Sequence, residues 1–167
     1  AELRAYAATM AALCDRLVER LDVDLVLVPM YYAAWETDLP LARMLAERMR
    51  HHDRVQLVEA RHDIDEVVVA LDTLDAFVGT PMHSTILSTS RGVPTLALHY
   101  EPKGRAYFDC LGMREWTFDL ADLWTARGPE RLEARVLELW QRRREVRDAL
   151  HQRLPGLRRQ AMMSVRW

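Results

Sequence analysis

The chain has 167 residues, half of them hydrophobic, and its 23 basic and 25 acidic side chains leave a formal net charge of −2. This much apolar material fills the core of a folded domain, which excludes a disordered tail, a fibre and a disulfide-stabilised miniprotein. The two cysteines, Cys14 and Cys110, lack CxxC spacing. We therefore expect reduced thiols in a cytoplasmic protein, without a disulfide framework or a metal site.

The ends of the chain and its hydropathy also carry expectations. No apolar run approaches the ~20 residues that span a bilayer, so we expect no transmembrane segment. The first ten residues have the pattern of the middle of a helix, with neither an initiator Met nor a signal-peptide pattern. We therefore expect the chain to be part of a longer protein.

Helical and strand patterns alternate along the first 128 residues. Apolar residues at three- and four-residue spacing predict the helices, and short apolar runs predict strands that are covered on both faces. Asp63 and Glu66 predict a capping box at one helix start. The predicted elements are, in chain order, helix 2–21, strand 24–29, helix 38–50, strand 55–58, a helix from residue 63, strand 75–78, helix 82–91, strand 93–98, helix 105–111 and a weak strand at 116–118.

This alternation predicts a doubly wound, mainly parallel Rossmann-like α/β sheet with helices on both faces, formed by residues 1–128. Such sheets usually open with a strand, so we expect one upstream of residue 1. A long helix follows from Pro129 to about Arg153, and residues 130–167 hold ten arginines against five acids. We interpret residues 129–167 as an Arg-rich helical extension that packs on this domain or on an absent N-terminal domain. No aromatic residues alternate with the arginines, so we expect no nucleic-acid partner, and a peripheral membrane contact stays open.

Ligands of such sheets bind beyond the carboxyl ends of the strands. The segment from Asp75 to Ser84, DAFVGTPMHS, runs from a strand through a turn into a helix. Thr80 suits the N-cap and Pro81 the first helical position, and this would place Met82, His83 and Ser84 in a first turn with unpaired backbone N–H groups. Such a helix start favours an anion, although an ordinary capped helix explains the same pattern equally well.

The next predicted strand is followed directly by residues 99–103, HYEPK, which would emerge at the same edge as His83. Lys103 is the only lysine in a chain that otherwise uses arginine. A compact ammonium is chemically distinct from a planar guanidinium, so this position favours a functional lysine, while a chance departure from the bias is the alternative.

The loop over residues 29–38 brings Tyr31, Tyr32 and Trp35 to that edge, and these aromatic rings suit either a sugar platform or a contact with a partner domain. Asp38 fits the cap of the following helix better than a catalytic acid. We interpret the pair His51 and His52 as solvated side chains, because adjacent histidines at a helix end do not converge on one metal ion.

Six segments combine into a pattern: Val28-Pro29-Met30, Asp38, DAFVGTPMH at 75–83, RGVPTLAL at 91–98, YEPK at 100–103 and Leu111-Gly112. In this order they resemble the polysaccharide pyruvyl transferase family, over nearly the whole chain. The resemblance implies the C-terminal half of a two-domain, glycosyltransferase-B-like fold.

The resemblance also implies a reaction, in which a pyruvyl group passes from phosphoenolpyruvate to two sugar hydroxyls and forms a cyclic ketal during cell-surface or exopolysaccharide biosynthesis. It implies no cofactor, phosphoenolpyruvate being the donor substrate, and it implies a saccharide acceptor and the N-terminal half of the same enzyme as partners. In the family an Arg-x-His at the helix start contacts phosphoenolpyruvate. His83 matches the histidine and Met82 the middle position, but Pro81 replaces the arginine. Lys103 matches the lysine of a Tyr-x-x-Lys pattern.

We therefore predict that His83 is catalytic, as a general acid or phosphate ligand. The predicted substrate-binding residues are Lys103, Met82, Thr80, Ser84, Tyr100 and Asp38. Two alternatives remain, the donor-binding half of a nucleotide-sugar glycosyltransferase and a non-catalytic family member. The segment from Pro81 to Gly92 contains no acid that would grip a sugar, which counts against the first, whereas Pro81 favours the second. We do not expect this segment to be active without the rest of the enzyme.

Overall fold

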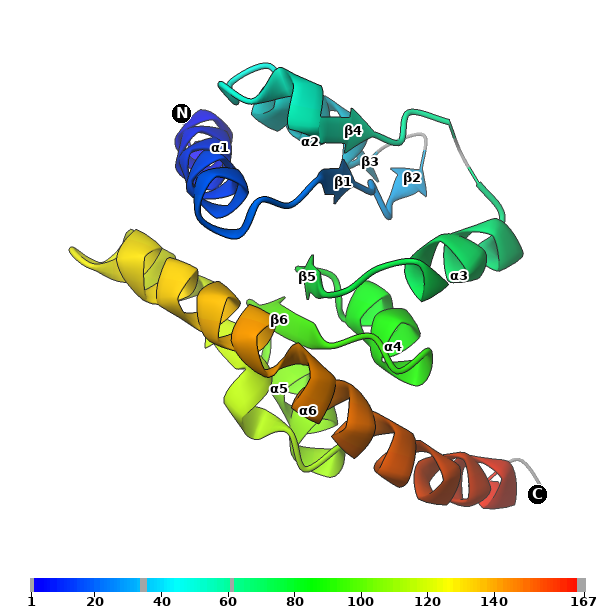
Figure 1. Cartoon of the computed structure of the whole chain (residues 1–167). Helices are drawn as coiled ribbons and strands as arrows, with labels where there is room; N and C mark the ends of the chain where they lie inside the picture. Colours follow the sequence, from blue (N-terminus) through cyan, green and yellow to red (C-terminus); the bar gives the residue numbers. More distant parts are fainter. Residues whose placement is uncertain (1, 34–35, 61, 165–167) are drawn as a thin grey trace. The chain divides into compact units, whose positions relative to one another are not determined.

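The computed structural model describes residues 2–33, 36–60 and 62–164 (Figure 1). The chain divides into two compact units, unit 1 with residues 1–62 and unit 2 with residues 63–167, and each is described by itself. Both contain parallel strands with helices packed against them, so the predicted Rossmann-like α/β fold is confirmed. The predicted boundary at residue 128 stays a prediction.

Unit 1 contains one parallel and one antiparallel pair of strands. Its elements are α1 (Glu2–Leu21), β1 (Leu25–Leu27), β2 (Tyr32–Ala33), β3 (Glu36–Thr37), α2 (Leu39–Ala46), the 3-10 helix η1 (His52–Arg54) and β4 (Val55–Leu57). β1 and β4 run parallel, with Leu25 opposite Val55. The β2–β3 pair is antiparallel and lies within the loop that the sequence left without secondary structure.

The core of unit 1 joins α1 to α2 and to the parallel strands. Ala11 and Cys14 of α1 pack with Leu45 and Met49, and the strand residues Leu25, Leu27 and Val55 lie against this cluster. Burial, with a smaller contribution from the neighbouring Asp15, raises the pKa of the Cys14 thiol to about 12. Cys14 is therefore protonated at neutral pH and acts as a small apolar side chain.

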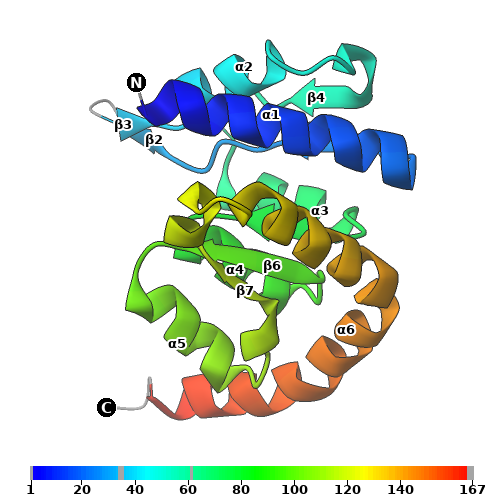
Figure 2. The ribbon, with the colours of Figure 1, turned by 90° about the vertical axis from the view of Figure 1, so that its left-hand side faces the viewer.

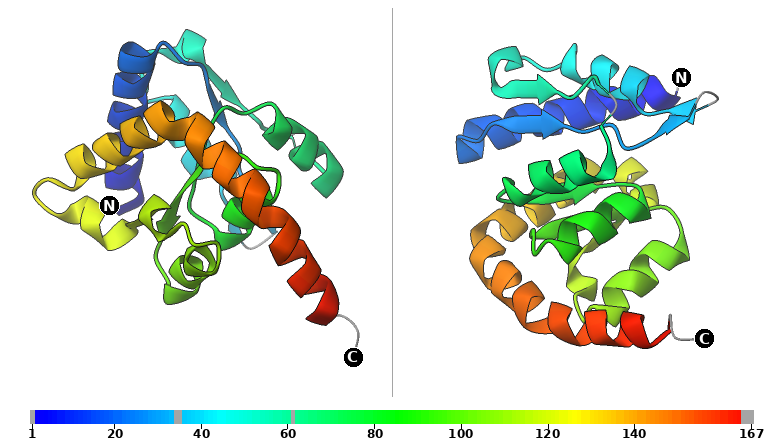
Figure 3. Two further views of the ribbon diagram at one scale, coloured as in Figure 1. Left: turned by 60° about the horizontal axis from the view of Figure 1, so that its bottom comes forward. Right: turned by 90° about the vertical axis from the view of Figure 1, so that its right-hand side faces the viewer.

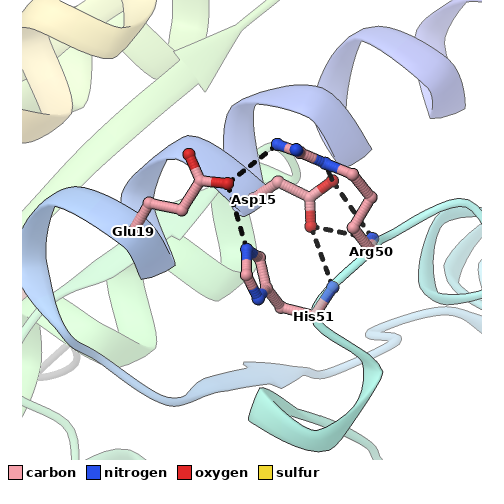
Figure 4. Close-up of polar contacts among 4 residues, drawn as sticks. All are labelled: Asp15, Glu19, Arg50 and His51. Atoms are coloured by element: carbon pink, nitrogen blue, oxygen red, sulfur yellow. Dashed lines mark hydrogen bonds and ion pairs between the residues drawn. The ribbon is translucent and has the colours of Figure 1, made fainter.

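A buried carboxylate fixes the turn after α2 (Figure 4). Asp15, on α1, is 3% exposed, and its oxygens accept the backbone N–H groups of Arg50 at 2.9 and 3.1 Å and of His51 at 3.2 Å. Glu19, one turn along α1, accepts from Arg50 Nη2 at 2.9 Å and lies 3.1 Å from His51 Nε2. After α2 the Arg48 and Met49 N–H groups donate to the Leu45 and Ala46 carbonyls in tight turns, and α2 ends at Ala46 and not at Arg50 as predicted. The Arg50 and His51 N–H groups that follow donate to Asp15.

Unit 2 is built on a sheet of three parallel strands in the order β5-β6-β7. Its elements are α3 (Ile64–Asp72), β5 (Phe77–Gly79), α4 (Met82–Ser90), β6 (Thr95–His99), α5 (Pro102–Cys110), η2 (Arg114–Trp116), β7 (Thr117–Asp119), η3 (Leu120–Trp124) and α6 (Gly128–Ser164). The predicted capping box is confirmed, since Asp63 accepts the Glu66 N–H and the Glu66 side chain accepts the Asp63 N–H. β6 is central and buried, and α4, α5 and α6 all pack against it.

α6 curves around unit 2, as Figure 2 and Figure 3 show. It continues to Ser164, past the predicted end at Arg153, and contains Pro155. A proline inside a helix removes one backbone hydrogen bond and favours a bend. α6 continues beyond Pro155. Its apolar stripe is buried through Leu132, Leu139 and Leu150. The Arg-rich extension therefore packs on unit 2.

We expect Asp15→Asn to lower the free energy of unfolding by about 2–4 kcal/mol, because an amide NH2 would then face backbone N–H donors in a buried site. Urea unfolding followed by circular dichroism measures this change. Glu19→Gln is the matched control, since Glu19 is exposed in the same cluster and its loss should cost less than about 1 kcal/mol. Equal stability of D15N and wild type would show that the carboxylate does not fix this turn.

Candidate functional site at the carboxyl edge of unit 2

Parallel pairing brings the carboxyl ends of β5, β6 and β7 to one edge of the sheet. Gly79, the last residue of β5, lies opposite Ala97, and His99, the last residue of β6, lies opposite Asp119. Only two residues separate α4 and α5 from the strands that precede them, so their first turns lie at this edge. This is the position at which open α/β sheets bind ligands.

The turn from β5 into α4 differs by one residue from the prediction. Pro81, and not Thr80, is the N-cap, with φ −67° and ψ 134°, because its backbone is extended and the helical angles start at Met82. The Pro81 carbonyl accepts the Ser84 N–H at 3.0 Å. Within the described part of the chain, the N–H groups of Met82 and His83 have no acceptor. The first turn of α4 thus presents two backbone donors at its start.

The side chains of this turn take different environments. His83 is exposed, whereas Met82 and Thr80 are half-buried. Ser84 is 1% exposed, and its hydroxyl donates to the Pro81 carbonyl at 2.7 Å. A Cβ on Gly79 would come within 2.8 Å of the Ser84 hydroxyl oxygen, so the strand end and the helix start pack directly on each other. The predicted substrate contacts of these residues stay predictions, with His83 the most accessible side chain of the group.

The buried face of α4 is lined with hydroxyl groups that are hydrogen-bonded. Ser88 pairs with Thr95 of β6 at 2.8 Å, and Thr89 pairs with the Tyr107 hydroxyl of α5 at 2.7 Å. Burial raises the pKa of Tyr107, and the hydrogen bond with Thr89 partly offsets this rise. The Ser- and Thr-rich composition between Pro81 and Gly92 therefore joins α4 to β6 and α5.

The start of α5 carries the single lysine. α5 begins at Pro102, three residues before the predicted start, and proline at the first helical position is the sequence signal for this boundary. Lys103 Nζ lies 2.7 Å from Glu101 Oε2, with the Lys103 side chain 63% exposed. The hydrogen bond that Lys103 donates to Glu101, together with the negative charge of Glu101, raises the pKa of Lys103, which therefore keeps its proton at neutral pH. Tyr100, also exposed, precedes this pair.

Asp38 belongs to unit 1 and lies in the loop after β1. It occupies the N-cap position of α2, but its side chain makes no capping hydrogen bond. Its Oδ2 instead accepts the backbone N–H groups of Met30 at 3.1 Å and Tyr31 at 3.0 Å. The prediction that the Asp38 side chain caps α2 is therefore wrong, because the carboxylate bonds to the loop before the helix. It shapes this loop at the carboxyl end of β1. Trp35 and the Tyr32 side chain lie outside the described residues, so the aromatic platform stays a prediction.

Comparison with known proteins decides the family. The sequence model described as polysaccharide pyruvyl transferase matches residues 1–102, which include both strands of the parallel pair in unit 1 and the start of α4 with His83. The chain belongs to the polysaccharide pyruvyl transferase family. The family indicates a pyruvyl-transferase-like function. Neither curated proteins nor solved structures gave a match.

The Arg-x-His pattern that the resemblance implies would put arginine at position 81, where this member of the polysaccharide pyruvyl transferase family has Pro81. Proline has neither a backbone N–H nor a polar side chain, so Pro81 offers no donor at this position. Across residues 2–33, 36–60 and 62–164, we find no group of three His, Cys, Asp or Glu side chains that could hold a metal ion. The same ranges hold no helix with the length and hydropathy needed to cross a bilayer.

Sequence reasoning missed the ion pair between Glu101 and Lys103, although the two residues stand only two positions apart. It also missed the contacts that α6 makes with the ends of α4 and α5, because nothing in a helical pattern shows which carbonyl groups its arginines reach. The one available signal was Pro102, which marks a helix start and so places Lys103 in a first turn.

We expect His83→Ala to change the free energy of unfolding by no more than about 0.5 kcal/mol, because the imidazole is exposed and bonds to no other described residue. Thr89→Val is the matched buried change in the same helix, and the loss of its bond to Tyr107 should cost about 1 kcal/mol. Denaturant unfolding of both variants checks the pair. A large loss of stability in H83A would assign His83 a structural role instead of a functional one.

Proposed function

We propose that this chain binds phosphoenolpyruvate at the first turns of α4 and α5 and serves in the transfer of its pyruvyl group to two sugar hydroxyls. One observation carries the proposal: His83, two unpaired backbone N–H groups and Lys103 lie at one edge of a parallel sheet in a member of this family. Phosphoenolpyruvate enters as the donor substrate, and no cofactor is required.

The charges at this edge suit a ligand with a carboxylate and a phosphate. The N-terminus of α4 offers the N–H groups of Met82 and His83 together with the positive end of the helix dipole. Lys103 adds a full positive charge from α5. Glu101 competes for this ammonium at 2.7 Å, so an incoming anion has to displace the Glu101 carboxylate or share the lysine with it.

The reaction needs one proton delivered to carbon and two hydroxyls that lose theirs. Protonation of the methylene carbon of phosphoenolpyruvate makes the neighbouring carbon electrophilic, one sugar hydroxyl adds to it, and the second displaces phosphate as the C–O bond breaks. One hydroxyl proton balances the proton now held in the methyl group, and the other leaves with phosphate. An imidazole is the side-chain type that gives and takes protons near neutral pH, so we assign His83 the role of general acid or phosphate ligand.

With proline and not arginine at position 81, the anion must be held by other donors. A guanidinium would offer two parallel donors to a carboxylate, and Pro81 offers none. We propose that the backbone N–H groups and Lys103 take its place. Tyr100, and Asp38 in unit 1, stay predicted substrate-binding residues. Pro81 also favours a second candidate, a family member that binds the anion without catalysing transfer.

We further propose that the chain is the C-terminal half of a two-domain, glycosyltransferase-B-like enzyme whose N-terminal half holds the acceptor. We propose a cytoplasmic location for this role, since the two cysteines lack CxxC spacing and Cys14 is buried in the core of unit 1. The saccharide acceptor is then the second substrate.

Calorimetric titration of the intact protein with phosphoenolpyruvate tests the proposal. We expect Lys103→Met to weaken binding about tenfold, because the ammonium is lost, and Glu101→Gln to tighten it several-fold, because the competing carboxylate is lost. His83→Ala is expected to abolish pyruvyl transfer while the protein stays folded.

A nucleotide sugar serves as the comparison ligand in the same titration. Binding of the nucleotide sugar alone would contradict the pyruvyl transferase proposal and favour a glycosyltransferase. Phosphoenolpyruvate binding without any transfer to a saccharide would identify the non-catalytic family member.

A further inference from the structure

The two helices that begin at the candidate site both end against α6. α4 is followed by Gly92 at φ +78° and α5 by Gly112 at φ +64°, the left-handed conformation in which glycine ends a helix. A Cβ on Gly92 would lie 2.3 Å from His151 Nε2. A Cβ on Gly112 would lie 3.2 Å from Arg153 Nη1. Side chains of α6 therefore cover both helix ends at close range.

Two arginines of α6 donate to the last carbonyl groups of these helices. Arg158 Nη2 donates to the Ser90 carbonyl of α4 at 2.9 Å. Arg153 Nη1 donates to the carbonyl oxygens of Leu111 and Gly112, just after α5, at 2.9 and 2.6 Å. The final carbonyls of a helix have no partner within the helix and carry its negative end, so a guanidinium satisfies both needs.

Other arginines of α6 have different surroundings. Arg142 pairs with Glu138 and Glu145 of α6 itself and lies 5.2 Å from the ring of Trp116. Arg144 is exposed, and we find no bond from it to any described residue. Arg153 and Arg158 are thus distinguished by donating to the helices that carry the site.

From these contacts we infer that Arg153 and Arg158 are positioning residues for the site at the opposite ends of α4 and α5. The identity of the ligand at that site, phosphoenolpyruvate, rests on the proposed function. Each helix has nine residues, so a contact at its last turn sets the direction of an ~13 Å rod whose first turn holds His83 or Lys103. The family match ends at residue 102, so this role belongs to a part of the chain that the match does not cover.

The central experiment compares Arg153→Met, Arg158→Met and the control Arg144→Met in the intact ¹⁵N-labelled protein. We expect R158M to shift the amide resonances of Met82 and His83 most, and R153M to shift that of Lys103 most. R144M, the same substitution at an exposed site of the same helix, should shift neither. Phosphoenolpyruvate should bind R153M and R158M about fivefold more weakly than wild type, and R144M with unchanged affinity.

Lysine variants separate positioning from general stability. R153K and R158K keep the charge but lose the planar donors, so their resonance shifts and affinities should fall between those of wild type and the methionine variants. If a methionine variant does not fold, its lysine counterpart carries the comparison with wild type.

The outcomes distinguish this inference from the proposed function. Variants that melt at lower temperature, but keep wild-type resonances in the first turns and wild-type affinity, would overturn the positioning role. A wild-type protein that does not bind phosphoenolpyruvate would contradict the proposed function, whereas the amide resonances would still support or overturn the positioning role.

Discussion

The parallel pairing of β5, β6 and β7 is the constraint on which unit 2 depends. Because all three strands point the same way, every helix that follows a strand begins at one edge of the sheet and returns to the other. The first turns of α4 and α5, with their positive dipole ends, therefore gather at the carboxyl edge. The carbonyls at their other ends are reached by Arg153 and Arg158 of α6. Ligand chemistry and structural support are thus separated onto opposite edges.

The chain uses its two kinds of cation accordingly. Lys103 is exposed at a first turn and holds one carboxylate, a contact that a ligand can replace. Arg153 reaches two carbonyl oxygens with one nitrogen, and Arg158 reaches a third. In the sequence the arginines appeared to be a compositional bias with one exception. In the structure the exception lies at the candidate site, and some of the arginines satisfy backbone groups far from it.

The sequence predicted those features that depend on local signals. Alternating helix and strand patterns predicted the Rossmann-like fold, and Asp63 and Glu66 predicted a capping box. It also predicted that His83 and Lys103 follow neighbouring strands. These signals lie within a few residues of the feature they specify, so no knowledge of distant contacts was needed.

Features set by distant residues were beyond the sequence. Asp15 fixes the turn after α2 from 35 positions before Arg50, because it accepts the Arg50 and His51 N–H groups. The Asp38 side chain bonds to the loop before it and not to the helix it precedes, because the Met30 and Tyr31 N–H groups both donate to its Oδ2. α6 continues past Pro155, with Leu150 and Leu154 buried before the proline and Arg158 bonded to the Ser90 carbonyl beyond it.

The central claim is that an anionic substrate binds at the carboxyl edge of unit 2. Mapping the amide resonances of the intact wild-type protein during a titration with phosphoenolpyruvate tests it most directly, since the map reports where the ligand binds. We predict the largest shifts at Met82 and His83 in α4 and at Lys103 in α5. Shifts confined to the opposite edge, around Gly92 and Gly112, or the absence of any shift at saturating phosphoenolpyruvate, would contradict the claim.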